Sequence, residues 1–230
     1  MNDPKTMLRR AWITAGSSEL WNCQGTYCKI PYERLPRVER ATDDFGWLDD
    51  VSQALREVIG GTSTLSSSDN QIGNLEVVVE KTQSLKLNLP QPFLRFIRDA
   101  SLQAKVPTCT ACFLALSEDF IPFAGAQGYY LLRFLNDSQS CVMWYLCLGR
   151  DGSAEVLASD YFLEPEIFEA MDYEEVKRDD VFRELSFCAD TFTKFLYRFW
   201  VENTIWYSLR AGLPLTPVQK EYSSQITQRL

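Results

Sequence analysis

The sequence contains no histidine in 230 residues. That absence excludes Ser-His-Asp and Cys-His catalysis, a histidine general base and an ordinary histidine-containing metal site. The chain also has no GxSxG elbow, no GxxxxGKS/T loop and no GxGxxG turn, and Gly125 and Gly128 precede a predicted strand rather than a helix. The sequence therefore offers no phosphate-binding loop and no histidine-dependent hydrolase site.

Long apolar runs are missing as well. A membrane-spanning helix needs about 18 uncharged apolar residues, and Arg133 and Asp137 interrupt the best candidate segment. Basic residues near the N-terminus are followed by no continuous apolar run, which argues against a secretory signal. We therefore expect a cytoplasmic protein that makes no membrane contact.

Basic residues are scarce in one part of the chain. The net charge is −8, and residues 160–184 hold ten acidic and three basic residues, a net charge of −7. The remaining 205 residues hold 21 acidic and 20 basic residues, a net charge of −1. Because nucleic-acid binding needs clustered Lys and Arg that displace counterions from phosphates, we expect no nucleic-acid partner.

The seven cysteines do not resemble the framework of a small secreted disulfide protein, so reduced and mostly buried thiols are the leading interpretation. Cys109 and Cys112 form a CxxC that could supply two thiolates to a structural zinc site, but Cys23 and Cys28 lie far from it in the sequence. A redox CxxC needs its first thiol at a helix N-terminus, whereas this one runs into a predicted strand. We expect no cofactor, and keep zinc at Cys109 and Cys112 as an alternative.

Length and composition indicate one compact core. The chain is 46% hydrophobic and 13% aromatic, and a folded chain of this size buries roughly 70% of the surface that its unfolded form exposes. We predict a core domain over residues 47–230, preceded by an N-terminal extension over residues 1–46. Trp12, Trp21 and Tyr27 indicate that the extension packs on the core.

Helices are predicted on both sides of a short strand in the first half of the core. Apolar residues recur at helical spacing over residues 47–59, and Gly60 stops the pattern. Residues 75–79, LEVVV, have the β-branched content of a short strand. Pro90 and Pro92 then favour the entry to a helix whose apolar face follows directly.

The densest apolar region predicts a β-sheet. The short, turn-like connections NDSQ and GRDG favour consecutive antiparallel hairpins. The strand after Ser140 is apolar on both faces, so we expect both faces to be covered. Predicted strands occupy residues 109–116, 128–135, 140–148 and 154–159; Val142, Trp144, Leu146 and Leu148 point to one face, and Cys141, Met143, Tyr145 and Cys147 to the other.

A broad apolar stripe after the acidic segment predicts a long helix. Asp190 is a plausible N-cap, and Gly212 lies just past the end. A shorter amphipathic helix is predicted after residue 215. We expect the long helix to pack on the sheet, which gives an α+β fold with an antiparallel β-meander packed against several helices.

Arg133 is the one charged residue inside the meander strands that could have a special role. It could be a buried guanidinium paired with Asp137 or with acids from another element, it could bind a ligand, or its head could reach water at the strand end. We favour the structural ion pair over the ligand site.

The order of these segments resembles the SUKH superfamily, which includes Smi/Knr-type fungal cell-wall-synthesis regulators and many bacterial toxin-immunity proteins. An LP-plus-helix segment, a meander with a WYL-like strand, a glycine turn and a following helix carry the resemblance, over roughly residues 47–210. The matching positions are Leu89 and Pro90, Phe93 and Phe96, Arg133 to Asp137, Trp144 to Leu146, Gly152, Val156, Ser159, and Phe192 to Leu196.

The resemblance implies a non-enzymatic protein-binding module, and in particular an immunity-type protein that neutralises a cognate toxin. The candidate protein-binding residues are Asp172, Glu174, Glu175, Asp179 and Asp180, because an acidic face attracts a basic partner and raises the association rate. A housekeeping scaffold or regulator of the same fold, and an enzyme that uses cysteines or carboxylates, are the alternatives. The acidic segment could also be only a solvated loop.

Overall fold

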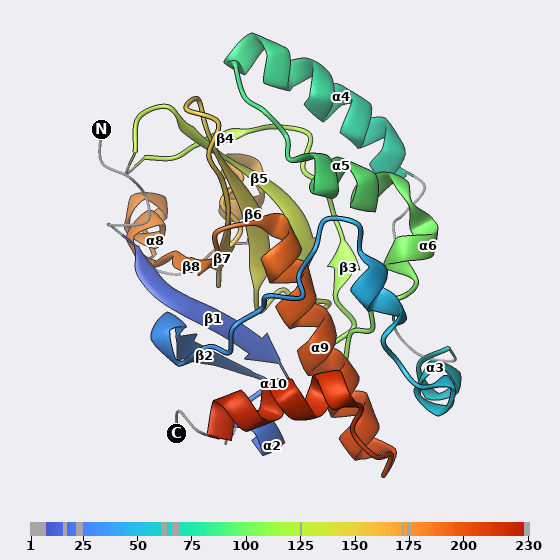
Figure 1. Cartoon of the computed structure of the whole chain (residues 1–230). Helices are drawn as coiled ribbons and strands as arrows, with labels where there is room; N and C mark the ends of the chain where they lie inside the picture. Colours follow the sequence, from blue (N-terminus) through green and yellow to red (C-terminus); the bar gives the residue numbers. More distant parts are fainter. Residues whose placement is uncertain are drawn as a thin grey trace.

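A computed structural model of the chain shows a twisted sheet with helices on both faces (Figure 1). The structure describes residues 8–15, 18–21, 25–60, 64–65, 70–124, 126–171, 173 and 176–227. Within this part of the chain the strands form an eight-stranded mixed sheet in the order β2-β1-β8-β7-β6-β5-β3, and β4 pairs with β5 outside this path. The predicted α+β class is confirmed.

Helices and strands alternate irregularly along the chain. The strands are β1 (Arg9–Ala15), β2 (Tyr27–Pro31), β3 (Phe113–Leu114), β4 (Ile121–Pro122), β5 (Tyr129–Asn136), β6 (Met143–Gly149), β7 (Ala154–Ser159) and β8 (Ser186–Ala189). The helices are α2 (Ser18–Trp21), η1 (Tyr32–Arg34), η2 (Gly46–Asp49), α3 (Gln53–Ile59), α4 (Asn70–Leu85), α5 (Gln91–Arg98), α6 (Ala100–Gln103), α7 (Pro165–Ala170), α8 (Arg178–Glu184), α9 (Phe192–Arg210) and α10 (Pro217–Thr227).

The centre of the sheet is the predicted meander. Strands β5, β6 and β7 pair antiparallel in sequence order. Gly152 in the β6–β7 turn has a φ of 87°, a conformation that glycine adopts without a Cβ penalty. Outside the meander the order of the strands in the sheet does not follow their order in the sequence. Strand β1 lies between β2 and β8 and pairs parallel with β8. The whole sheet is therefore mixed, and only its meander is antiparallel throughout.

Both faces of β6 are covered, as its sequence predicts. Val142, Trp144, Leu146 and Leu148 belong to the larger apolar core on the α9 side, while Met143, Tyr145 and Cys147 belong to a second core on the opposite side. Each of these side chains is at most 2% exposed. Cys141, predicted to share the face of Met143, precedes β6 and is exposed, so it is not part of the second core. Strict alternation places successive side chains on opposite faces, so a strand that is apolar throughout needs two layers to cover it.

Helix α9 forms the main layer on one face of the sheet. Its N-cap is Thr191, whose Oγ1 accepts a bond of 3.2 Å from the Lys194 backbone N–H, and not Asp190 as predicted. Gly212 follows the last turn with a φ of 65°, which suits a helix end. Helices α3, α5 and α10 also pack on α9, so this helix is buried on most sides.

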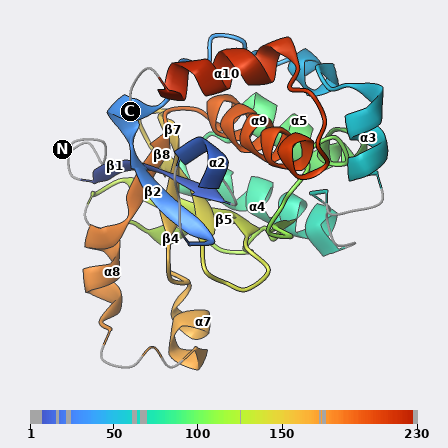
Figure 2. The same ribbon diagram turned by 90° about the horizontal axis from the view of Figure 1, so that it is seen from below.

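The opposite face of the sheet is covered by the segment between β7 and β8. Figure 2 shows α7 and α8 extending from the sheet on the side away from α9. Phe162, Leu163, Val181 and Phe182 anchor this segment in the second core. Part of the acidic segment is therefore helical, and β8 follows it as a strand that the charge pattern did not indicate.

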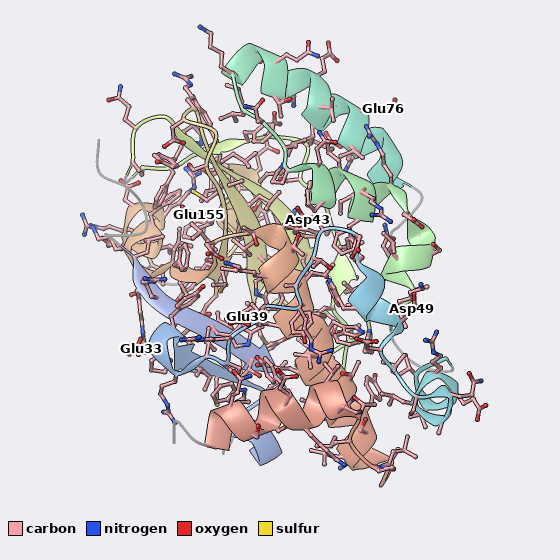
Figure 3. The ribbon with its side chains drawn as sticks, in the orientation of Figure 1. Glu33, Glu39, Asp43, Asp49, Glu76 and Glu155 are labelled. Atoms are coloured by element: carbon pink, nitrogen blue, oxygen red, sulfur yellow. The ribbon has the colours of Figure 1, made fainter. Side chains whose placement is uncertain are left out.

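Three local predictions are wrong. Residues 75–79 lie inside α4, because Leu75, Val78 and Thr82 bury one helical face while Glu76 points outward (Figure 3), and this periodicity outweighs β-branched propensity. The helix predicted from residue 47 begins only at Gln53, with Ser52 as its N-cap. Of the strand predicted over residues 109–116, only Phe113 and Leu114 pair with β5.

The described N-terminal residues contribute to the same sheet. Strand β1 pairs with β8, and Trp12 and Trp21 reach across to α9, where both indole N–H groups donate to Glu202. The Tyr27 hydroxyl donates a bond of 2.7 Å to Asp137 at the end of β5. Residues before position 47 are thus connected to the core by strand pairing and by buried hydrogen bonds.

Candidate binding cleft

The five predicted protein-binding acids are only partly placed by the structure. Asp179 and Asp180 lie exposed in the first turn of α8, and Asp180 pairs with Arg183 at 3.0 Å. The other three, Asp172, Glu174 and Glu175, lie outside the described residues.

A cleft of about 600 Å³ lies beside this segment, between the chain that precedes β5 and the start of α7. We call it the α7 cleft. Its volume is within the range of roughly 300–1,000 Å³ that is usual for ligand sites in proteins. The cleft is lined by Asn74, residues 116–122, Arg133, residues 164–167 and Arg178.

A buried ion pair lies in the α7 cleft. The Arg133 Nε donates a bond of 2.6 Å to Oε1 of Glu164, and the two side chains are only 10% and 12% exposed. Arg133 also donates from Nη1 to Asn136 Oδ1 at 3.0 Å and lies over the Phe162 ring. The predicted structural ion pair of Arg133 is confirmed, and of the two partners considered, Asp137 or an acid from another element, it is the second, Glu164.

Tyr145 completes the bonding of Glu164. Arg133 and Tyr145 are cross-strand partners on β5 and β6. The Tyr145 hydroxyl donates to Glu164 Oε2 at 3.2 Å and accepts from the Leu163 backbone N–H at 3.0 Å. Burial raises the pKa of Tyr145 well above its usual value, and the negative charge of Glu164 acts in the same direction. The phenol therefore stays protonated, and its hydrogen bond holds Glu164, the residue directly before α7, in place.

The opposite wall of the cleft is tied to α4. Asn74 donates to the Leu116 carbonyl at 3.1 Å, and the Lys81 ammonium donates to the Glu118 carbonyl at 3.0 Å and pairs with Asp119. The Ser117 hydroxyl accepts from the Arg133 backbone N–H at 3.1 Å. Both walls of the cleft are therefore held in place by hydrogen bonds to other elements of the fold.

Exposed carboxylates flank the cleft on both sides. Glu118 and Asp119 are exposed on the wall tied to α4, and Glu166 is exposed in the first turn of α7. The lining residues carry four carboxylates and two guanidinium groups, a net charge of −2. The charge of Arg133 is balanced by Glu164, so the accessible charge at the edge of the cleft is negative.

The CxxC cysteines are not activated. Burial raises the pKa of the Cys109 thiol to about 12, and it also raises the pKa of the Cys112 thiol. Both are free thiols, and among the described residues no three Cys, Asp, Glu or His side chains are grouped to hold a metal ion. A thiol with a raised pKa forms little thiolate and is a weak nucleophile and ligand.

One cysteine departs from the expected reduced state. Cys28 in β2 is disulfide-bonded, whereas Cys109, Cys112, Cys141 and Cys188 are free thiols. The prediction that the thiols are reduced is therefore wrong for Cys28. Cys28 belongs to the edge strand of the sheet, Cys188 lies in its interior, and Cys141 is exposed outside its strands.

Glu202 in α9 is a further buried charged residue, and the sequence did not draw attention to it. Its Oε2 accepts from Trp12 Nε1 at 2.8 Å and from Thr14 Oγ1 at 2.7 Å, and its Oε1 accepts from Tyr222 at 2.7 Å and from Trp21 Nε1 at 3.3 Å. Burial raises the pKa of Glu202. The four donors come from β1, α2 and α10, so this carboxyl connects both ends of the described chain to the central helix.

No family model, no curated protein and no solved structure matches this chain. The resemblance to the SUKH superfamily therefore stays a prediction. None of the helices in the described part of the chain is long and apolar enough to cross a membrane.

The sequence alone indicates two of the segments that line the cleft but not the third. It singled out Arg133 and the acidic segment, which meet through Glu164. It missed Glu118 and Asp119, because nothing in the local sequence indicates that a loop far from residue 164 forms the opposite wall. The sequence did contain a signal for Glu164. Proline in the first turn fixes where α7 begins, so Pro165 places Glu164 directly before this helix.

Proposed function

We propose that this chain is a non-enzymatic protein-binding module, and specifically an immunity-type protein that binds and neutralises a cognate toxin. The observation that carries the proposal is the α7 cleft. Its walls are held by bonds to β5, β6 and α4, and its accessible carboxylates flank an opening beside a projecting pair of helices. A preformed acidic concavity suits recognition of a basic partner, because little conformational freedom is lost on binding.

The distribution of charge supports a basic partner. Residues 160–184 carry a net charge of −7, and most of their described acids are exposed, among them Glu166, Glu169, Asp179, Asp180 and Glu184. Localised charge of one sign steers an oppositely charged partner and raises its association rate. Nuclease toxins have basic active-site surfaces that attract polyanions, so an acidic face fits such a target.

The state of the candidate nucleophiles supports binding over catalysis. The pKa of Cys109 is raised to about 12, and Glu164 is occupied by bonds from Arg133 and Tyr145. An activated nucleophile needs a lowered pKa or an adjacent base. An enzyme that uses cysteines or carboxylates is therefore the less favoured candidate.

The proposed compartment is the cytoplasm, where an immunity-type protein meets its toxin. The free thiols of Cys109, Cys112 and Cys188 support a reducing compartment. The disulfide of Cys28 favours an oxidising one. Fractionation of the source cell decides between them, and recovery of the protein outside the cytoplasm would reject this part of the proposal.

A housekeeping scaffold or regulator of the same fold is the second candidate. It would use the same acidic face for an endogenous partner. A gene neighbourhood without a toxin-like reading frame would favour it over the immunity-type protein.

Affinity capture tests the proposal. The tagged protein is incubated with lysate of its source at low salt and at about 0.5 M salt, where exposed charges are largely screened. We expect a stoichiometric basic partner at low salt that is lost at high salt. A variant with charge reversal at Asp172, Glu174, Glu175, Asp179 and Asp180 should bind it more weakly. Binding that is unchanged in this variant and independent of salt would reject the acidic face as the binding surface.

A further inference from the structure

The α7 cleft has a polarity that restricts its occupant. Two guanidinium groups, those of Arg133 and Arg178, line it together with the carboxylates of Glu118 and Glu166. Arg133 is the buried member of this set, whereas both carboxylates are exposed. The exposed carboxylates of Glu118 and Glu166 therefore lie at the outer part of the cleft, while the buried charge of Arg133 is paired with Glu164.

The two arginines are fixed and do not neutralise the outer carboxylates. Arg133 is bonded to Glu164, and Arg178 donates from Nε to the Leu163 carbonyl at 2.8 Å and lies over the Phe182 ring. On the other wall, Lys81 is paired with Asp119. Among the described residues, Glu118 and Glu166 form no ion pair, so their negative charge is available to a partner.

We propose that the α7 cleft binds a basic peptide segment of the partner protein, a proposal that rests on the function proposed above. Lysine or arginine side chains of that segment bond to Glu118 and Glu166. Its backbone carbonyls accept hydrogen bonds from the guanidinium groups of Arg133 and Arg178. The aliphatic parts of its side chains pack on the apolar lining, which includes Pro122, Pro165 and Ile167.

Other occupants fit these observations less well. An acidic segment would meet Glu118 and Glu166 before it reached the arginines, and like charges at an interface oppose association. A nucleic acid would be repelled for the same reason. A purely apolar helix would cover the carboxylates of Glu118 and Glu166 without supplying a hydrogen-bond partner, and burial of an unpaired charge costs free energy.

A peptide titration tests the proposal without knowledge of the partner. The probe is N-acetylated, C-amidated hexa-arginine with a fluorophore, and hexa-glutamate is the negative probe. Binding to the full chain is measured by fluorescence anisotropy at constant ionic strength. The test variant combines Glu118→Lys with Glu166→Lys, both exposed positions where no fold defect is expected.

A matched control separates local binding from global charge. The control variant combines Glu39→Lys with Glu57→Lys, which are exposed and lie outside the cleft lining. Figure 3 shows Glu39 on the chain beside α9, a helix that covers the other face of the sheet. Both double variants change the net charge by +4, from −8 to −4.

We expect the cleft variant to bind hexa-arginine about tenfold more weakly than the parent and the control variant to differ less than about twofold, since two attractive contacts become repulsive only in the first. Equal weakening in both variants, no weakening in either, or equally tight binding of hexa-glutamate would overturn the proposal. If a captured partner binds the cleft variant as it binds the parent, the basic-segment proposal fails while the protein-binding function stands.

Discussion

Replacement of Glu202 by glutamine probes the buried network between α9 and the chain termini. The carboxyl accepts four hydrogen bonds, two from the indole N–H groups of Trp12 and Trp21 and two from the hydroxyls of Thr14 and Tyr222. Hydroxyls can rotate to accept a bond, whereas indole nitrogens can only donate. The site therefore needs an acceptor at both carboxyl oxygens.

Glutamine supplies only one such acceptor. With its carbonyl facing Trp12, the shorter indole bond at 2.8 Å, its amide group takes the position that accepts from Trp21 at 3.3 Å. Two N–H donors then oppose each other in a buried site. An unsatisfied buried donor costs about 1–3 kcal/mol, and the longer bond belongs at the lower end, so we expect Glu202→Gln to lower the free energy of unfolding by about 1 kcal/mol near pH 4.

A double-mutant cycle with Trp21→Phe isolates this effect. Trp21→Phe removes the opposed donor, so the double variant should be more stable than the sum of the two single losses predicts, by about 1 kcal/mol. Urea unfolding followed by far-UV circular dichroism gives the four free energies. Additive losses would refute the reasoning, because they would mean that Trp21 and the carboxyl do not interact.

The loss of stability caused by Glu202→Gln should also depend on pH, and the raised pKa of Glu202 gives the direction of this dependence. Burial raises the pKa of Glu202 in the folded state above its unfolded value, which is about 4.3. The parent protein then binds more protons when folded, and the contribution of Glu202 to stability is full below the unfolded pKa and is lost as pH rises through the folded pKa. The cost of Glu202→Gln should therefore shrink between pH 4 and pH 8. A cost that grows over this range would contradict a raised pKa.

Three further predictions concern other parts of the fold. Arg133→Met leaves the carboxylate of Glu164 buried without its cation and should lower the free energy of unfolding in urea by about 3–4 kcal/mol. Addition of Glu164→Leu should restore part of this loss, and a double variant less stable than Arg133→Met would contradict the reasoning. Thr191→Ala removes the N-cap of α9 and should lower the free energy of unfolding by about 1 kcal/mol. Asp190→Ala loses only a half-exposed ion pair and should cost less than about 0.5 kcal/mol. A larger cost for Asp190→Ala than for Thr191→Ala would support the N-cap expected from the sequence. Alkylation of the denatured, non-reduced protein should leave Cys28 unmodified, and mass spectrometry that finds it labelled would contradict its disulfide.

The parts of the fold that the sequence predicts well are those with dense local signals. The alternation of Trp144 with Tyr145 placed their side chains in two different cores, since strand geometry alone decides the face. Pro90 and Pro92 marked the start of α5 correctly. In these cases the residue types and the spacing both favour the same structure.

The failures come from tertiary context. The stretch around Val78 is rich in β-branched residues, yet α4 forms because its buried face follows the helical period and packs on the core. Strand β8 and its parallel pairing with β1 join residues about 175 positions apart, and no local pattern encodes such a pairing. The α7 cleft was missed for the same reason, because its two walls come from segments about 45 residues apart that only the folded sheet brings together.

Hydrogen exchange of the protein with and without its captured partner tests the central claim most directly. If the α7 cleft is the binding surface, amides in residues 116–122 and 164–170 should exchange more slowly in the complex, while those of α10 (Pro217–Thr227) on the other side of the sheet should be unchanged. Slower exchange in α10 with no change around the cleft would place the partner elsewhere and contradict the account.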